Sequence, residues 1–194
     1  MEKAANAGEG NAMKPTVGLI VLIAGFLAAL PVAKPAAAFE AADLDRLIKT
    51  KSCPGCDLSG ANLWKLPLYK ATLKGTNLEG ANLQGVVLWQ ANLEGANLKK
   101  ALLLDTNFRH ANLKGADLEE ADMRRCNIRY ADLRGANLWS VDLRRGFMQG
   151  AKMQGANLKY AKLRRALMKE VNFEGAIWVN GKKCEKGSIG MCLQ

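Results

Sequence analysis

A large apolar residue recurs at every fifth position from Leu58 to Phe173, 24 times in succession without a missed position. The residue two places before it is usually Ala, and the residue directly before it is commonly Asn or Asp, as in Ala61-Asn62-Leu63. A period of five residues matches neither the 3.6-residue repeat of an α-helix nor the two-residue repeat of a β-strand. Short units at a fixed spacing instead indicate a solenoid, whose units bury their apolar residues by stacking.

The unit A(D/N)LXX, repeated over residues 58–175, resembles that of the pentapeptide-repeat family. The resemblance implies an all-β solenoid, a right-handed quadrilateral β-helix of about six coils with four pentapeptides in each coil. It also implies that the central apolar residue and the residue two places before it point into the core, while the other three point outward. With neighbouring coils at the spacing of paired strands, about 4.8 Å, the coils would extend over roughly 29 Å.

The segment before the repeats has the composition of a targeting signal. The apolar run Val17–Ala33 follows Lys14, and small residues precede Phe39, which together predict a signal peptide over residues 1–38 with cleavage after Ala38. An uncleaved anchor in the inner membrane is the alternative, although the run is short for a membrane span. Because Met13 stands directly before Lys14, we expect it to be the true start of the chain.

Two short segments are expected to close the ends of the core, because a solenoid needs caps. Residues 39–57 form the predicted N-terminal cap, with an amphipathic helix over residues 39–50 that carries apolar residues at helical spacing: Leu44, Leu47 and Ile48. Residues 176–194 form the predicted C-terminal cap, in which Asn180-Gly181 is typical of a hairpin turn.

Four of the five cysteines lie in the caps: Cys53, Cys56, Cys184 and Cys192. Cys-x-x-Cys is a zinc-ligand spacing, but one metal could not reach two pairs at opposite ends of coils that extend over roughly 29 Å. Two cap disulfides suit an exported protein, and free or redox-active thiols are the alternative. Cys126 occupies an inward position reserved for small residues, so we expect it in the core. We expect neither a metal site nor a cofactor.

The chain carries a formal net charge of +10. Residues twenty apart stack on one face of a four-sided coil, and one face then gathers seven cations over three coils: Arg124, Arg125, Arg144, Arg145, Lys162, Arg164 and Arg165. Asp122 and Asp142 neutralise them in part. Like charges about 5 Å apart repel each other, so this face favours contact with an anion or full solvation.

The next face carries apolar residues at half of its outward flanking positions, and of these we take Tyr69, Trp89 and Phe147 as candidate contact residues beside the arginines. Another face has Gly at the last position of every unit, for example Gly75 and Gly155, which suits a turn with positive φ.

No catalytic arrangement is visible in the sequence. His110 is the single histidine and is expected to point outward, and no glycine-rich phosphate loop opens a helix. We therefore expect a non-enzymatic exported scaffold or interaction protein of the periplasm or cell envelope, with the thylakoid lumen as an alternative compartment. Its expected partners are an acidic protein, a polysaccharide or an anionic lipid surface, and not a small-molecule substrate; a homodimer stays open.

The sequence leaves three alternative functions to compare. Some pentapeptide-repeat proteins mimic DNA and act on topoisomerases, but mimicry requires a negative surface and a cytoplasmic location, whereas this chain is basic and carries a predicted export signal. Direct nucleic-acid binding by the basic face is electrostatically feasible, but the expected compartment argues against it. A thiol-redox protein that uses Cys53 and Cys56 is the other alternative.

Overall fold

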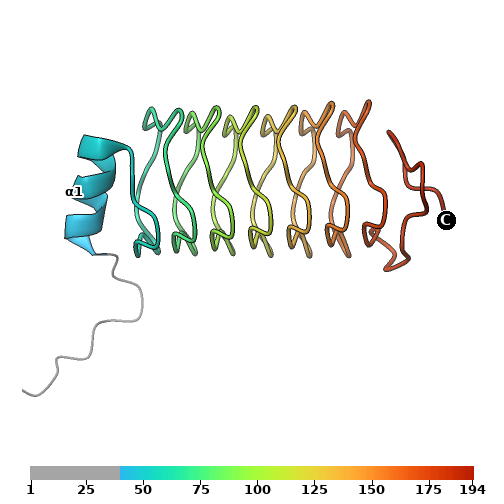
Figure 1. Ribbon diagram of the computed structural model, residues 1–194, viewed down its shortest axis with the longest axis horizontal. Coiled ribbons are helices and arrows are strands. Elements are labelled where there is room, and N and C mark those ends of the chain that lie inside the picture. The colour runs from blue at the N-terminus through green and yellow to red at the C-terminus, as the bar shows by residue number, and fades with distance from the viewer. Residues whose placement is uncertain (1–39) are drawn as a thin grey trace, which may run out of the picture. The chain divides into compact units, whose positions relative to one another are not determined.

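The computed structural model describes residues 40–194, so the predicted signal peptide with Met13 lies outside the described residues. Helix α1, Ala41–Thr50, is the single helix of this described part. No helix within residues 40–194 is long and apolar enough to cross a membrane. From Ser52 onward the chain forms successive coils that stack in chain order between α1 and the C-terminal segment (Figure 1).

The coils are joined by parallel β-bridges between residues twenty apart, from Ser52–Thr72 to Asn157–Ile177. Each face contributes one bridging residue rather than a longer strand, and the four bridges in each twenty-residue turn make the coil four-sided. The bridges begin at Ser52, so part of the segment that we assigned to the N-terminal cap belongs to the regular ladder. Cys53 consequently takes a central position one unit before Leu58.

The core contains the inward positions that the resemblance to pentapeptide repeats implies. Every central residue from Leu58 to Phe173 is buried except Leu163 and Met168, which are half-buried. Cys126 fills a small inward position and is fully buried, as predicted. The large central side chains and the alanines between them therefore form one continuous apolar column, which is the expected source of stability in a solenoid.

The last position of each pentapeptide has a left-handed backbone. Gly75 and Gly155 have φ of 64° and 70°, as predicted for the glycine-bearing face. The other faces need the same conformation with larger residues, since Ser140 and Arg145 have φ of 57° and 58°. The corner of every unit thus requires positive φ, and glycine is the residue that adopts it at no steric cost.

In most units an Asn or Asp stands before the central residue and holds the turn. The Oδ1 atom of Asn82 accepts a hydrogen bond from the Gln84 amide at 3.1 Å, and its Nδ2 donates to Asn62 Oδ1 in the coil before, also at 3.1 Å. Side chains of this type hydrogen-bond their own backbone two residues on, which stabilises a turn. The polar residue of the repeat is therefore explained by the fold.

Helix α1 closes the N-terminal end of the core. Leu47 is fully buried and Leu44 half-buried against the first coil, but Ile48 is 55% exposed, so its predicted place on the apolar face is wrong. The Asp57 amide donates to Asp43 Oδ2 at 2.9 Å, which holds the helix over the coil. The helix ends at Thr50, because the next residue, Lys51, has a left-handed backbone with φ of 55°.

The C-terminal segment covers two faces of the last coil. The predicted turn at Asn180-Gly181 is confirmed by an antiparallel bridge between Ile177 and Lys183, and a second antiparallel bridge joins Asn172 to Ile189. The other two faces of the last coil end at Leu163 and Met168. These two residues are half-buried because no segment of the described chain is bridged to their faces.

Each cap holds one disulfide, as predicted. Cys53 pairs with Cys56 and Cys184 with Cys192, at Cα–Cα distances of 5.4 Å and 5.1 Å. A carboxylate oxygen of Asp43 and the two sulfurs of the first pair lie within 4.8 Å of one another. The disulfide leaves neither sulfur as the thiolate that a metal would need.

Candidate functional site

The arginine-bearing face has an open hollow of about 340 Å³. Its walls come from the last two positions of three stacked pentapeptides, with one apolar residue from the coil before: Leu104, Arg124, Arg125, Arg144, Arg145, Arg164 and Arg165. The structure therefore brings all six predicted arginines together around one hollow. Their backbones are fixed by the bridge ladder, because residues twenty apart stack on one another.

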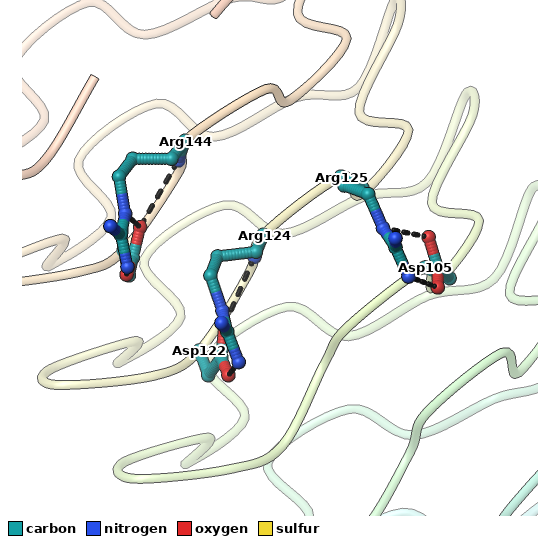
Figure 2. Close-up of polar contacts among 6 residues, drawn as sticks. Asp105, Asp122, Arg124, Arg125 and Arg144 are labelled. Carbon is teal, nitrogen blue, oxygen red and sulfur yellow. Dashed lines mark hydrogen bonds and ion pairs between the residues drawn. The ribbon is translucent and has the colours of Figure 1, made fainter. Parts of the chain in front are cut away.

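Two of these arginines fold back onto the aspartate two residues earlier in their own pentapeptide. Arg124 donates from Nε to Asp122 Oδ1 at 2.7 Å and from Nη2 to Oδ2 at 2.6 Å. Arg144 makes the same pair with Asp142, at 2.9 Å and 2.6 Å, and Figure 2 shows Arg124 and Arg144 in parallel poses on successive coils. Such two-point pairs are among the stronger charge-assisted hydrogen bonds.

The pKa values of these carboxyl groups reflect the pairing. The side-chain hydrogen bonds from Arg124 lower the pKa of Asp122. Burial alone would raise the pKa of Asp142, but the hydrogen bonds and charge of Arg144 outweigh burial and lower it. Both groups are thus ionised at neutral pH and cancel the charges of their arginines.

A third arginine is neutralised across coils. Arg125 forms an ion pair with Asp105, which occupies the same position one coil earlier, and its Nε donates to Asp105 Oδ1 at 2.9 Å (Figure 2). Asp105 is not among the predicted site residues, because it lies in the coil before the three that carry arginine pairs. Sorting the next coil by the same spacing of twenty would have found it.

The remaining three arginines have no carboxylate partner in the part of the chain that the structure describes. Within residues 40–194, no salt bridge involves Arg145, Arg164, Arg165 or Lys162. The sequence explains this difference: position 162 is lysine instead of aspartate, and an arginine stands one coil before both Arg145 and Arg165. The uncompensated positive charge is therefore concentrated at the C-terminal end of the face.

The aromatic residues that we predicted beside the arginines do not line the hollow. Tyr69, Trp89 and Phe147 lie on the neighbouring face, and each has its own cation nearby. The Lys51 Nζ atom lies 3.4 Å from the centroid of the Tyr69 ring, and Arg129 Cζ lies 4.6 Å from that of Phe147. These contacts are cation–π pairs. The structure thus separates the predicted contact residues into an arginine group and an aromatic group, and Lys162 stands beside the first without lining the hollow.

His110 is exposed, as predicted, and stacks on Tyr130 with ring centroids 5.1 Å apart and an interplanar angle of 13°. Neither ring lines the hollow. The hollow itself offers guanidinium donors and an apolar wall, which suit binding of an anion rather than proton transfer, because arginine stays protonated.

Several solved structures resemble this chain. A pentapeptide repeat protein (Rfr23) from the cyanobacterium Cyanothece 51142 is 28% identical, with 71% of this chain and 97% of that chain covered and a TM-score of 0.46. HetL, involved in heterocyst differentiation regulation in Nostoc sp. strain PCC 7120, is 25% identical over 68% and 86% of the two chains, with a TM-score of 0.32. A pentapeptide repeat protein from the Arabidopsis thaliana thylakoid lumen is 22% identical over 66% and 70%, with a TM-score of 0.24.

The family assignment comes from the repeats themselves. No curated protein sequence gives a significant match. The family model described as pentapeptide repeats matches eight copies, over residues 52–90, 91–129, 101–139 and 131–169. Proteins of this family are right-handed quadrilateral β-helices and are generally non-catalytic, and the bridges between residues twenty apart agree with that fold. The matched segments span more than half of the chain, which therefore belongs to the pentapeptide-repeat family.

Proposed function

We propose that this protein is a non-enzymatic scaffold or interaction protein that binds an acidic partner through its arginine-lined face. One observation carries the proposal: Arg145, Arg164 and Arg165 face a common hollow and have no carboxylate partner among residues 40–194, while the other arginines there are paired. Bringing three like charges together costs free energy, which an anionic ligand would recover. The stacked coils hold the backbones of these residues in place, so little ordering is needed on binding.

The disulfides support a location outside the cytoplasm. Each cap contains one disulfide, and such bonds persist in oxidising compartments. We therefore propose that the protein acts in the cell envelope or in a lumenal compartment. A redox function is less well supported, because Cys53 is fully buried and Cys56 is 5% exposed, and thiol–disulfide exchange requires access to a sulfur.

DNA mimicry is also poorly supported by the site. A mimic must present negative charge, whereas the hollow of this chain is lined by arginines. Direct binding of nucleic acid through the same face needs only the positive charge, so duplex DNA belongs among the ligands to be tested.

Binding to a panel of polyanions tests the proposal. We would compare poly-glutamate, heparin, anionic lipid vesicles and duplex DNA at low and high salt, using the unchanged protein and a variant in which Lys162, Arg145, Arg164 and Arg165 are replaced by Gln. A control variant removes four charges from elsewhere on the protein: Lys114→Gln, Lys152→Gln, Lys159→Gln and Lys186→Gln. We expect salt-sensitive binding that only the first variant loses. Equal weakening in both variants, or no binding to any probe, would reject the proposal.

A further inference from the structure

The C-terminal end of the coils is only half closed. The C-terminal segment bridges to Asn172 and Ile177, on two of the four faces. On the other two faces the coil ends with residues 161–170, where Leu163 and Met168 are half-buried while all the corresponding central residues before them are buried. Core side chains are thus partly exposed at one end of the solenoid, next to the arginines of the hollow.

The preceding coil shows which hydrogen bonds normally close this face. Leu143 donates its amide to the Lys162 carbonyl at 2.9 Å, and Arg145 donates to the Arg164 carbonyl at 3.1 Å. In the opposite direction, the Lys162 amide donates to the Val141 carbonyl at 2.9 Å. Each coil therefore presents two amides and one carbonyl on this face to the coil that follows it.

The same three groups of the last coil have no partner in the described part of the chain. Among residues 40–194, the amides of Leu163 and Arg165 meet no backbone acceptor, and the Ala161 carbonyl meets no backbone donor. Unpaired groups along the edge of a β-structure form a template on which another extended chain can pair. We call this edge, residues 161–165, the open edge.

The charges beside the open edge determine which kind of segment can pair with it. Lys162, Arg164 and Arg165 point outward from it and form no salt bridge within residues 40–194. A second copy that paired through its own open edge would bring the same three cations against them, and like charges in close contact oppose association. The open edge therefore favours an extended segment that carries acidic side chains.

We propose that the open edge binds an extended acidic segment of a partner protein, which pairs with it as an additional strand. This inference rests on the proposed function, because Arg164 and Arg165 belong to both sites. An apolar side chain of the segment would cover Leu163 in the way that each central residue covers the one before it. Acidic side chains on either side of it would meet Lys162, Arg164 and Arg165.

Repeating the ladder by one coil gives the register of the segment. Its second residue donates its amide to the Ala161 carbonyl and accepts at its own carbonyl from the Leu163 amide, and the carbonyl of its fourth residue accepts from the Arg165 amide. The third residue is the apolar one. Its amide points away from the coil, as the Leu163 amide does, and needs no partner. A peptide Ala-Glu-Leu-Glu-Glu, acetylated and amidated, has these properties and serves as the probe.

Two N-methylated forms of this peptide separate strand pairing from charge attraction. Methylation of the second residue's amide removes the donor to Ala161, whereas methylation of the third residue's amide removes no predicted contact. Both forms keep the same charge and composition. The affinity of each peptide is measured by NMR titration of the protein with its disulfides intact. We expect the first methylation to weaken binding about tenfold or more, and the second to change the affinity little. We also expect slower hydrogen exchange of the Leu163 and Arg165 amides in the complex.

Three outcomes would overturn the inference. Equal affinities of the two methylated peptides, without protection of the Leu163 amide, would mean that acidic ligands contact only the arginine side chains, and the proposed function would survive. Concentration-dependent protection of that amide in the free protein would assign the open edge to self-association. Failure of the peptide and of every polyanion to bind would reject both proposals together.

Discussion

Lys162 pairs with Asp142 in the parallel bridge ladder, one coil further along the arginine-bearing face. Asp142 binds Arg144 at two points, as Asp122 binds Arg124. A lysine ammonium has no acceptor for the next arginine in this series, Arg164. The lysine at this ladder position thus leaves Arg164 without the kind of partner that Arg124 and Arg144 have.

Restoring the aspartate should weaken polyanion binding. In Lys162→Asp we expect the new carboxylate to bind Arg164 as Asp142 binds Arg144, so that the site loses its lysine and one free arginine. For a polymeric ligand such as heparin, the slope of log affinity against log salt concentration should then decrease in magnitude by about two, because about two fewer ions are released on binding. The control Lys114→Asp makes the same change in net charge elsewhere, and an equal effect of both variants would show that net charge alone matters.

Removing an aspartate should have the opposite effect. In Asp122→Asn the amide oxygen still accepts from the Arg124 backbone, a bond of 3.2 Å, but the guanidinium loses its counter-charge. We expect tighter heparin binding, and a loss in the free energy of unfolding of about 1 kcal/mol or less because the pair is partly exposed. Titration calorimetry and urea unfolding measure the two effects. Unchanged affinity would mean that Arg124 takes no part in binding even when it is free.

The paired aspartates make stability depend on pH. Hydrogen bonds from their arginines lower the pKa of Asp122 and Asp132, and Arg144 lowers that of Asp142 against the effect of burial. Since the folded-state values lie below the unfolded value of about 3.9, this stabilisation is present above about pH 5 and is lost as the pH falls through the folded-state values. Urea unfolding at pH 7, 5 and 3 should show that the free energy of unfolding falls less on acidification in a variant with Asp122→Asn, Asp132→Asn and Asp142→Asn than in the unchanged protein. An equal decrease in the free energy of unfolding with pH in the two proteins would contradict this.

The half-closed end predicts unequal costs of core truncation. Leu143 is fully buried, whereas Leu163 occupies the same position one coil later and is half-buried. We expect Leu143→Ala to lower the free energy of unfolding by about 3 kcal/mol, and Leu163→Ala by about half of that or less. Chemical denaturation measures both. Equal losses would mean that the last coil is covered in solution.

The left-handed corner predicts a purely backbone effect. Gly155 has φ of 70°, and a Cβ atom there would meet no atom within 4 Å. We expect Gly155→Ala to cost about 1 kcal/mol of stability because an L side chain disfavours this conformation. Ser140→Ala, at a corner with φ of 57° that already holds a side chain, should change stability by less than about 0.5 kcal/mol. Similar costs for the two variants would contradict the account of the corner.

The sequence predicts the features of this protein that follow from its period. The family resemblance implies four units per coil with Leu143 and Cys126 in the core, and arranging the residues by twenty then gathers the arginines on one face, because every unit has the same backbone. It could not predict the pairing of Arg125 with Asp105, since long side chains choose partners by local geometry. The sequence pattern also placed Ile48 wrongly and did not indicate the open edge. The caps do not repeat, and how much of the end coils they cover depends on tertiary packing.

The arginine side chains offer the most direct test of the proposed binding site. Their Nε–Hε groups give separate NMR signals, which can be followed while poly-glutamate is added. We predict that the signals of Arg145, Arg164 and Arg165 shift first and most, while that of Arg134, which is paired with Asp132 on another face, stays in place. Uniform shifts of all arginine signals, or no shift at the hollow while the polymer binds, would contradict the proposal that this face recognises an acidic partner.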